Sequence, residues 1–283
     1  MRSTAIRRRN TMVLCAMVMA ALAGLTFIAT GLSFLTLLFA LLLLGCLFSM
    51  AWALWVGHQS QRAIDQAAVH TDGVTMGWAA PFYDALCSSL GIGRDFRLET
   101  LRLANIAAGD RVLDVGCGTG VLTCLAAHAV GPSGHATGID PSAAMIAAAR
   151  RNGASEGSSA AFRLAAIEEL PYADGSFDIV LSSFTLHHLP PEVKRTGLRE
   201  VYRVLKGGGR LLAVDIDRPA NALWWLVVWP LLFSSSAAPN LRGDVPAYLQ
   251  KAGFSPVEVR ARNWGLVTSW SATKPLAPAG GRA

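Results

Sequence analysis

The chain has 283 residues, of which 52% are hydrophobic, and its formal net charge is +6. Most of this charge comes from Arg2, Arg7, Arg8 and Arg9, because the residues that follow them carry a net charge of only +2. So small a basic excess excludes the electrostatic footprint of a nucleic-acid-binding protein. The five cysteines form no C-x-x-C pair, so we expect neither a metal site nor a disulfide framework.

The N-terminal segment from Thr11 to Gly57 contains no charged residue. As a helix it would be about 70 Å long, roughly twice the thickness of the hydrocarbon core of a membrane. The segment therefore predicts two transmembrane helices, over residues 11–30 and 34–56, joined by a turn at residues 31–33. A helix suits the hydrocarbon interior because it satisfies its own backbone hydrogen bonds.

Basic residues flank this hairpin on both sides and predict its orientation. The N-terminal arginines precede the first span and Arg62 follows the second, so both flanks are expected in the cytoplasm. We therefore expect a two-span protein of the cytoplasmic membrane, with both termini on the cytoplasmic side. The alternative is a signal peptide cleaved near Ala21–Ala23, after which the second span would still anchor the chain.

After a polar linker at residues 58–77, residues 78–272 alternate between strand and helix patterns. This alternation, with glycine turns, predicts an α/β domain with a mostly parallel sheet and helices on both faces. The K-G-G-G run at residues 206–209 predicts a glycine stop for the preceding helix. We expect a disordered tail at 273–283. The predicted strands are 111–116, 135–140, 160–165, 177–183, 210–217, 255–261 and 266–272, and the predicted helices are 120–130, 142–152, 190–205 and 244–253.

The loop after the first predicted strand contains three glycines, Gly116, Gly118 and Gly120, preceded by Asp114. Ligands of open parallel sheets bind beyond the carboxyl ends of the strands, and glycines there let a ligand approach the backbone. Asp140 ends the second strand, where its carboxylate can accept hydrogen bonds from both ribose hydroxyls.

The charges around this loop distinguish between two cofactors. Asp114 would repel a pyrophosphate but would suit an ammonium group. The third glycine also comes one residue early for the dinucleotide pattern G-x-G-x-x-G. S-adenosylmethionine, which has an ammonium, a ribose and no phosphate, is therefore favoured. A nicotinamide-dependent dehydrogenase is the alternative that this spacing opposes.

Four blocks of the sequence together resemble a known family: VLDVGCGTG, GIDPS, LPYADGSFDIVLSSFTLHHL and VLKGGGRLLAVD. They are similar to class I S-adenosylmethionine-dependent methyltransferases, and closest to the branch with ubiquinone/menaquinone C-methyltransferases and bacterial phospholipid N-methyltransferases. The resemblance covers about residues 78–272. It implies a Rossmann-like fold with a seven-stranded, mostly parallel sheet.

The resemblance also implies roles for individual residues around the cofactor. Family members usually place an aspartate two residues before the acids of an xEELP block, where it meets the adenine amino group. Here Ala166 occupies that position, which leaves the backbone of Ile167 for the adenine. A non-catalytic membrane adaptor that retains the pocket therefore stays an alternative. The implied cofactor contacts are Asp114, Gly116, Cys117, Gly118 and Gly120 at the methionine end, Asp140 at the ribose, Pro141 and Met145 beside the adenosine, and Ser183.

Methyl transfer mainly requires that the protein align the nucleophile, the methyl carbon and the sulfur. A general base is needed only where the nucleophile must lose a proton. His187 and His188, after the fourth predicted strand, are the candidates for this base or for a substrate contact. Tyr83 is a third candidate, because the N-terminal helix of this family often folds over the cofactor. Each of the three can instead serve only in packing.

An apolar insertion at residues 219–243 indicates the class of acceptor. Its continuous apolar part is too short to span a membrane, and it is rich in tryptophan. We interpret it as a lipid-facing lid, with Trp224 and Trp225 as substrate contacts; ordinary packing over the pocket is the alternative. With the predicted hairpin it favours a lipophilic acceptor at a membrane. Asp215 and Asp217 would favour a phospholipid amine headgroup, whereas His188 would favour the carbon of a quinol, and the sequence leaves both open.

Overall fold

The computed structural model describes residues 69–276. The predicted transmembrane hairpin, most of the predicted linker, and residues 277–283 of the predicted tail lie outside the described residues. Within residues 69–276, no helix is both long enough and apolar enough to cross a membrane. The two-span topology therefore stays a prediction.

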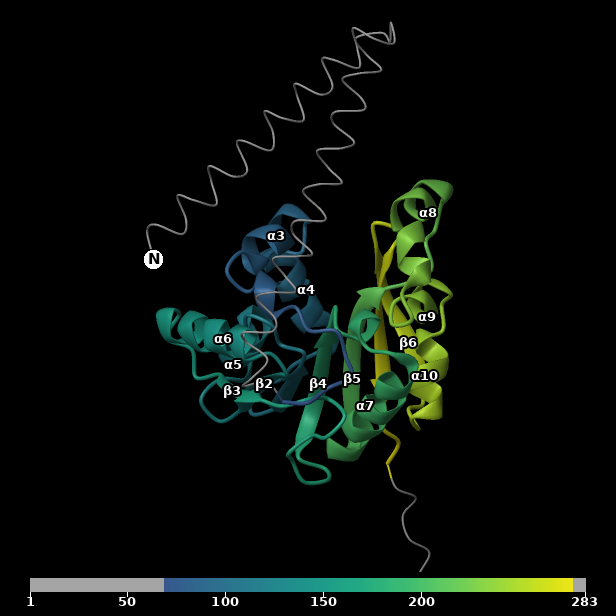
Figure 1. Cartoon of the computed structure of the whole chain (residues 1–283). Coiled ribbons are helices and arrows are strands. Elements are labelled where there is room, and N and C mark those ends of the chain that lie inside the picture. The colour runs from purple at the N-terminus through teal and green to yellow at the C-terminus, as the bar shows by residue number, and fades with distance from the viewer. Residues whose placement is uncertain (1–68, 277–283) are drawn as a thin grey trace, which may run out of the picture. The chain divides into compact units, whose positions relative to one another are not determined.

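A seven-stranded sheet runs through the described part of the chain, with strand order β3-β2-β1-β4-β5-β7-β6 (Figure 1). Strands β1 to β5 pair in parallel, and β7 is antiparallel to both β5 and β6. This arrangement confirms the predicted Rossmann-like, mostly parallel seven-stranded sheet. The strands are β1 (Arg111–Val115), β2 (His135–Asp140), β3 (Ala161–Leu164), β4 (Phe177–Ser183), β5 (Leu205–Ile216), β6 (Val257–Asn263) and β7 (Val267–Thr273).

Helices cover both faces of the sheet, as the alternating pattern predicted. Successive side chains of a strand point to opposite faces. Accordingly, Val112 joins the buried cluster that includes α4 and α5, whereas Leu113 and Val115 join the cluster that includes α7 and α10. The helices are η2 (Gly77–Ala79), α3 (Tyr83–Ser89), α4 (Arg94–Ala104), α5 (Val121–Val130), α6 (Ala143–Ser155), η3 (Leu186–His188), α7 (Pro191–Val204), α8 (Ala222–Val228), η4 (Trp229–Phe233), α9 (Ala238–Leu241) and α10 (Val245–Lys251).

The junction between α7 and β5 differs from the predicted glycine helix stop. Helix α7 ends at Val204, and Leu205 already has extended backbone angles. The glycines therefore do not cap the helix but lie inside β5, where Gly208 has a φ of +79°. A Cβ added to Gly209 would lie 2.9 Å from the carbonyl oxygens of Asp178 and Lys206, so close backbone approach is the reason for glycine at this position.

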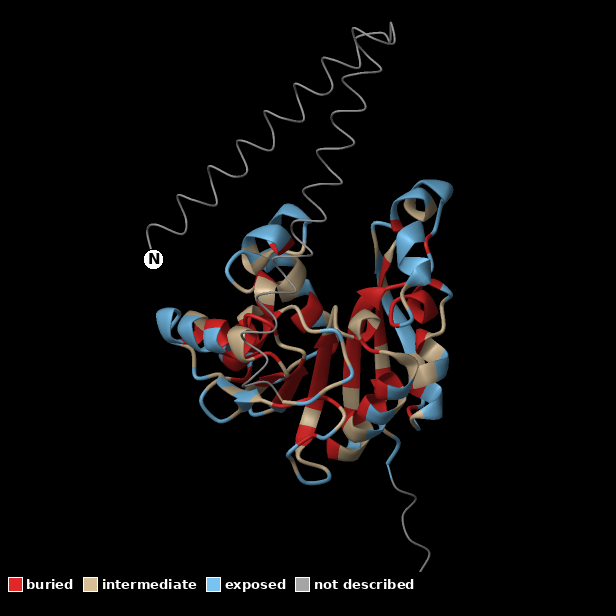
Figure 2. Ribbon diagram, in the orientation of Figure 1, coloured by how far each residue is buried: buried red, intermediate tan, exposed pale blue. Residues whose placement is uncertain are grey.

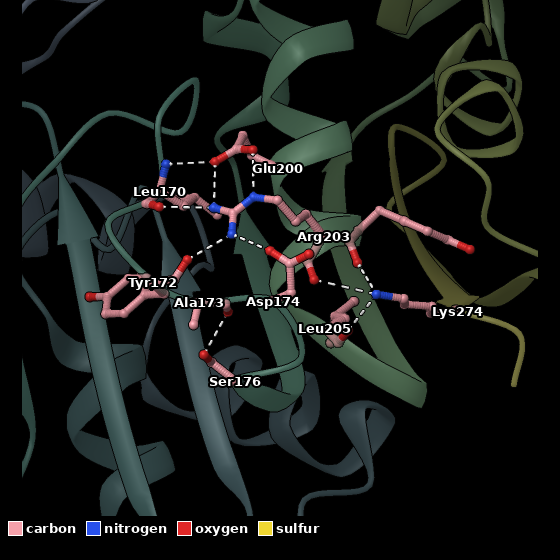
Figure 3. Close-up of polar contacts among 10 residues, drawn as sticks. Leu170, Tyr172, Ala173, Asp174, Ser176, Glu200, Arg203, Leu205 and Lys274 are labelled. Carbon is pink, nitrogen blue, oxygen red and sulfur yellow. Dashed lines mark hydrogen bonds and ion pairs between the residues drawn. The ribbon is translucent and has the colours of Figure 1, made fainter. Parts of the chain in front are cut away.

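Arg203, at the end of α7, fastens the loop that connects β3 with β4 (Figure 3). Its guanidinium donates to the carbonyl oxygens of Tyr172 (2.7 Å) and Leu170 (3.0 Å) and pairs with Asp174 and Glu200. Glu200 in turn accepts a hydrogen bond from the backbone N–H of Leu170 at 3.0 Å. Both the N–H and the carbonyl oxygen of Leu170 are therefore hydrogen-bonded to side chains of α7. These two bonds fix the course of the segment between β3 and Leu170.

Candidate cofactor and acceptor site

The glycine loop connects β1 to α5, and its three glycines all have positive φ: +71° at Gly116, +53° at Gly118 and +80° at Gly120. A Cβ added at Gly116 would overlap the side chain of Thr185, and one added at Gly120 would lie 2.6 Å from the ring of Phe162. At Gly118 the nearest atom, in the ring of Tyr83, would be 3.6 Å away. Packing against Thr185 and Phe162 therefore requires glycine at Gly116 and Gly120 in addition to any approach of a ligand, whereas at Gly118 a Cβ would make only an ordinary contact with Tyr83.

Two buried carboxylates flank this loop. Asp140, at the end of β2, accepts hydrogen bonds from the backbone N–H of Gly118 (3.0 Å) and of Ser142 (2.8 Å). Asp114, in β1, accepts a hydrogen bond from the hydroxyl of Thr123 at 2.7 Å. Burial raises the pKa of each carboxyl to about 6, although these hydrogen bonds oppose the shift. Both carboxyls are thus mainly ionised at neutral pH. Because burial removes water from each carboxylate, a bound cation or a hydroxyl donor would stabilise the ionised form.

Two neighbouring cavities, a larger and a smaller one, open on the loop. Tyr83, Gly116, Gly118 and Phe184 line both of them, so the two cavities share one wall. Of the predicted site residues, the larger cavity also contains Asp140, Pro141, Met145, Ile167 and His188, and the smaller contains Asp114, Cys117 and Ser183.

The remaining predicted site residues do not line these cavities. Gly120 is the N-terminal cap of α5, and Ala166 is buried beside the larger cavity without facing it. No residue of the 219–243 insertion lines either cavity, so Trp224 and Trp225 do not contact them. His187, Asp215 and Asp217 also lie outside their walls.

A segment before η2 closes one side of the larger cavity, although the sequence indicated only a linker there. Thr71, Gly73, Val74, Thr75 and Met76 line this cavity. The backbone N–H of Val74 donates to the carbonyl oxygen of His188 (2.9 Å), and the Thr71 hydroxyl donates to Oε1 of Glu168 (2.6 Å). The end of the predicted linker is thus part of the site.

His187 and His188 form the short helix η3 and have different surroundings. The Nδ1 atom of His187 lies 2.7 Å from Oδ1 of Asp215, and its backbone N–H donates to Oδ2 at 3.3 Å. The two imidazole rings lie 4.0 Å apart, and only His188 reaches the cavity. Burial and the neighbouring His187 lower the pKa of His188 to about 4, so its imidazole is neutral at pH 7.

Asp215 and Asp217 do not have the open position that an amine headgroup would require. The Asp215 carboxylate is completely buried and is occupied by His187 and by the backbone N–H of Ile216 (2.7 Å). Burial alone would raise the pKa of Asp215, but His187 and these hydrogen bonds hold the pKa below its usual value. Asp217 accepts a hydrogen bond from Thr268 at 2.8 Å and pairs with Arg262. The expectation that these acids face a headgroup is therefore corrected.

Two further residues of the site gave no signal in the sequence. Arg97, in α4, lines the smaller cavity; its side chain is 12% exposed and lies 3.7 Å from the Asp84 carboxylate. Phe184 follows β4 with a φ of +54°, which is uncommon for an aromatic residue. Its backbone N–H donates to the carbonyl oxygen of Val214 at 2.8 Å, which holds it in the shared wall. The positions of Arg97 and Phe184 depend on contacts with segments that are distant in the sequence, so no local sequence motif predicts them.

The tyrosine candidate occupies a central place. Tyr83 begins α3 and stands between the two cavities. Burial raises the pKa of its phenol well above the usual range, so it is protonated at neutral pH. It can therefore donate a hydrogen bond or pack against a ligand, but it does not provide a base.

The insertion after β5 consists of α8, η4 and α9; most residues of α8 and η4 are exposed, whereas α9 is buried (Figure 2). The indole N–H of Trp224 donates to the carbonyl oxygen of Trp264, and the ring of Trp264 stacks on Phe96 at 5.4 Å. A Cβ added at Gly91, after α3, would lie 3.2 Å from the Trp264 ring. The insertion, the β6–β7 turn and the end of α3 are therefore contiguous. The exposed apolar residues of these three elements are Leu86, Leu90, Leu223, Leu226, Val227, Trp229, Leu231, Leu232, Phe233 and Trp264.

The chain is similar to known proteins over part of its length. A family model described as a methyltransferase domain matches residues 112–209. An uncharacterized methyltransferase of Synechocystis is 33% identical over 191 residues, which cover 65% of this chain and 87% of that protein. A solved S-adenosylmethionine-dependent methyltransferase of Aquifex aeolicus shares the fold, with a TM-score of 0.50, 21% identity, and coverage of 63% of this chain and 89% of the other.

Two relatives with named substrates are matched over a smaller part of their length. An arsenite methyltransferase of Halobacterium salinarum is 36% identical over 61% of this chain and 45% of its own length. A demethylmenaquinone methyltransferase of Listeria monocytogenes is 37% identical over 54% of this chain and 65% of its own length. The chain thus spans less than two thirds of either relative.

Proposed function

Because the chain belongs to the S-adenosylmethionine-dependent methyltransferases, we propose that it methylates a lipophilic acceptor that it meets at a membrane surface. The observation that carries this proposal is the pair of cavities around Gly118, with the buried carboxylate of Asp114 in the wall of one and that of Asp140 in the wall of the other. Asp114 belongs to the smaller cavity and Asp140 to the larger, so the shared wall separates two different polar environments.

The smaller cavity fits the amino acid end of S-adenosylmethionine. Asp114 supplies a buried negative charge for an ammonium, and Arg97 supplies a positive charge for a carboxylate. A zwitterion carries one charge of each sign and so complements both side chains, of which Arg97 also lies 3.7 Å from the Asp84 carboxylate. A pyrophosphate, which carries only negative charge, would leave Asp114 uncompensated.

The larger cavity fits the nucleoside. Each Asp140 oxygen already accepts one backbone hydrogen bond and keeps a lone pair for a ribose hydroxyl. Beyond it the wall is formed by the side chains of Pro141, Met145, Ala165, Ile167 and Leu189, which suit the faces of an aromatic base. S-adenosylmethionine therefore has a place for each of its chemical parts.

When bound, S-adenosylmethionine supplies an electrophilic methyl group on a sulfonium, which needs no further activation. The chain would position the acceptor and exclude water from the shared wall, where Tyr83 and Phe184 stand. For an acceptor that must lose a proton, the neutral imidazole of His188 is the candidate base. His187, held by Asp215, would position it through ring contact at 4.0 Å.

The exposed apolar residues of α3, the insertion and the β6–β7 turn support a membrane-embedded acceptor. Phe233 is 81% exposed, Leu226 71% and Leu90 62%. Exposed apolar side chains on elements that meet at Trp264 are typical of an interaction surface, and tryptophan favours the membrane interface. We propose that this surface rests on the cytoplasmic membrane to which the predicted hairpin would anchor the chain, with the catalytic domain on the cytoplasmic side.

Among lipophilic acceptors we favour a quinol over an amine headgroup. Asp215 and Asp217 are already paired, so no carboxylate of this pair remains to bind an ammonium. The demethylmenaquinone methyltransferase of Listeria monocytogenes, by its name, acts on a quinone, and it is 37% identical to this chain over 158 residues. His188 is the group that would accept the proton of a quinol.

The test is to incubate membranes that contain the full chain with S-adenosylmethionine labelled at its methyl group. Label should enter a quinone of the organic phase. Label in phospholipid would select the amine alternative, and label only in water-soluble products would refute a lipophilic acceptor. Binding of S-adenosylhomocysteine without any transfer would favour the adaptor. Calorimetric binding of NADH in place of S-adenosylhomocysteine would favour the dehydrogenase.

A further inference from the structure

The elements that carry the exposed apolar side chains contain almost no acidic residue. These elements are α3 with the turn that follows it (residues 83–93), the insertion (219–243) and the β6–β7 turn (264–266), and they meet at Trp264. Together they form what we call the Trp264 surface. Asp84 is the one acid in these three stretches of the sequence. The charge of the surface therefore depends on the partners of Asp84 and on the basic residues beside it.

The Asp84 carboxylate is compensated within the domain. It accepts hydrogen bonds from the Thr119 hydroxyl at 2.6 Å and from the side-chain amide of Asn152 at 3.3 Å, and Arg97 lies 3.7 Å away. Thr119 belongs to the glycine loop and Arg97 to the smaller cavity. Asp84 thus connects α3 to the cofactor half of the site and leaves no unpaired negative charge on the Trp264 surface.

Arg218 lies at the base of the insertion and is exposed. The backbone N–H of Asp217, just before it, donates to the carbonyl oxygen of Leu266 at 2.7 Å. The backbone N–H of Ala220, two residues after it, donates to the carbonyl oxygen of Gly265 at 2.8 Å. Arg218 is therefore placed beside the β6–β7 turn. Its side chain makes no hydrogen bond or ion pair with any residue in 69–276.

Arg94 is the second exposed arginine without a partner among the described residues. It begins α4, three residues after Gly91, where an added Cβ would lie 3.2 Å from the Trp264 ring. Phe96, in the same turn of the helix, stacks on that ring. Asp95 follows Arg94 directly but forms no ion pair with it. A second free positive charge therefore borders the Trp264 surface.

The other arginines beside this surface are already paired with carboxylates. Arg242, Arg260 and Arg262 each lie within 3.8 Å of an acidic side chain. Only Arg94 and Arg218 are thus available to a partner, and the partner must supply the negative charge. A second copy of the chain, docked through the same surface about a two-fold axis, would bring like charges together. A bilayer with a net negative charge would complement both the apolar side chains and the two arginines.

We propose that the Trp264 surface docks on a bilayer that contains anionic phospholipid, with Arg94 and Arg218 bound to lipid phosphate groups. The inference rests on the membrane contact of the proposed function and adds the lipid charge that this contact requires. A guanidinium can bind a phosphate through two parallel hydrogen bonds. Each arginine near an anionic membrane surface should strengthen docking by about fivefold.

Hydrogen–deuterium exchange of the full chain in reconstituted vesicles tests this proposal. One set of vesicles contains phosphatidylcholine alone, and the other also contains phosphatidylglycerol. Docking excludes water from α8 and η4, so the backbone N–H groups of residues 223–233 should exchange about tenfold more slowly in the anionic vesicles. The difference should disappear at high salt, because salt screens the attraction between exposed charges.

A pair of matched double variants identifies the responsible arginines. Arg94→Gln combined with Arg218→Gln should remove most of the difference between the two lipids. Arg151→Gln combined with Arg199→Gln makes the same change in net charge at exposed, unpaired arginines of α6 and α7. Because attraction to a charged surface falls off within a Debye length, this control should keep the full difference.

Each remaining outcome would overturn a different part of the proposal. Equally slow exchange in both lipids would refute the requirement for anionic lipid but leave the membrane contact intact. Exchange as fast in both vesicles as in detergent would refute the membrane contact as well. Slowing that follows the number of chains per vesicle, and not the lipid, would show that a second copy covers the surface. Equal losses in the two double variants would overturn the assignment to Arg94 and Arg218.

Discussion

In the cofactor half of the site, buried carboxylates hold the backbone in place, whereas in the 219–243 insertion apolar side chains face outward. Asp140 fixes Gly118 and Ser142, and Asp114 holds Thr123. In the insertion, Leu226, Trp229 and Phe233 are exposed and make no such polar contacts. The two regions are thus specified by different physical forces.

The difference fits what each region would have to recognise. A single polar molecule requires fixed donors and acceptors at defined positions, which buried hydrogen-bonded groups provide. A membrane surface requires apolar area and little geometric detail. The insertion is nevertheless anchored at its base, where the fully buried Lys194 donates to Asn240 (2.6 Å) and to the carbonyl oxygen of Ser236 (3.3 Å).

The largest expected effect comes from breaking the cofactor half at Asp140. Asp140→Ala removes the acceptor for two ribose hydroxyls and also releases the backbone N–H groups of Gly118 and Ser142. We expect a loss of about 3 kcal/mol in the binding of S-adenosylhomocysteine, or roughly 150-fold, by calorimetry. Glu156→Gln, at an exposed acid outside the cavities, should leave the affinity unchanged. Wild-type affinity in Asp140→Ala would mean that the ribose lies elsewhere.

Acid should weaken the same half without any substitution. The pKa values of Asp114 and Asp140 are both raised to about 6 in the free protein, and an ammonium or two hydroxyls would favour the ionised forms. The dissociation constant of S-adenosylhomocysteine should therefore rise as the pH falls through 6, by about tenfold at pH 5 for each carboxylate involved. A dissociation constant that is flat between pH 5 and 7.5 would contradict this placement.

The contribution of these two carboxyls to the stability of the ligand-free chain should increase as the pH falls, whereas the affinity for S-adenosylhomocysteine should decrease. A raised carboxyl pKa means that the folded state binds more protons than the unfolded state between pH 4 and 6. These two carboxyls therefore stabilise the fold less as the pH rises through that window. The ligand-induced increase in melting temperature should accordingly be larger at pH 7.5 than at pH 5, which a thermal melt with and without S-adenosylhomocysteine measures.

The cofactor half was largely predictable from the sequence, and the reason is local. Asp114 and Asp140 lie at or beside the ends of strands that the apolar pattern marks, and parallel strands bring such ends together. The reason for each glycine was not predictable, because Thr185 and Phe162, which require Gly116 and Gly120, come from other segments. The same holds for Arg97 and for the Thr71–Glu168 hydrogen bond, which joins residues 97 positions apart.

The region expected to bind the methyl acceptor, which comprises η3, the end of β5 and the 219–243 insertion, was less predictable. The contacts of its side chains depend on strand register and on packing. His187 follows β4 and Asp215 lies near the end of β5, yet their pairing depends on how the two strands align. The sequence indicated an apolar insertion correctly, but it did not show which tryptophans face outward. Trp229 is exposed, whereas Trp224 is bonded to the β6–β7 turn.

A substitution in the insertion should produce the reverse of the Asp140 result. Replacing Leu226, Trp229 and Phe233 together by serine removes exposed apolar area, and the side chains of these three residues make no hydrogen bond or ion pair within residues 69–276. We expect turnover on an acceptor in vesicles to fall about tenfold, corresponding to roughly 0.5 kcal/mol per side chain, a fraction of full burial. Turnover on the same acceptor in detergent and the affinity for S-adenosylhomocysteine should not change. Val259→Ser, at an exposed apolar residue of β6, is the control, and equal losses in vesicles and detergent would mean that the insertion is simply part of the folded core.

The smallest expected effect tests whether the two regions are independent. Trp224→Phe keeps an aromatic ring but removes the indole N–H that donates to the carbonyl oxygen of Trp264. The ring of Trp264 stacks on Phe96, whose ring lies 5.8 Å from that of Phe184 in the cavity wall, so an aromatic path joins the insertion to the cofactor half. We expect a loss of about 1 kcal/mol in stability, or a decrease of roughly 3 °C in melting temperature.

The affinity for S-adenosylhomocysteine should nevertheless stay that of the parent chain in this variant. Phe184 is positioned by its backbone hydrogen bond to Val214 in β5, and this bond does not depend on the ring of Phe96. Trp225→Phe, at a neighbouring tryptophan on the same helix, is the matched control for the change of ring. If Trp224→Phe weakens cofactor binding while Trp225→Phe does not, the aromatic path transmits changes in the insertion to the cofactor half. The two regions would then act as one recognition unit, in which contact between the insertion and a membrane alters the affinity for the cofactor.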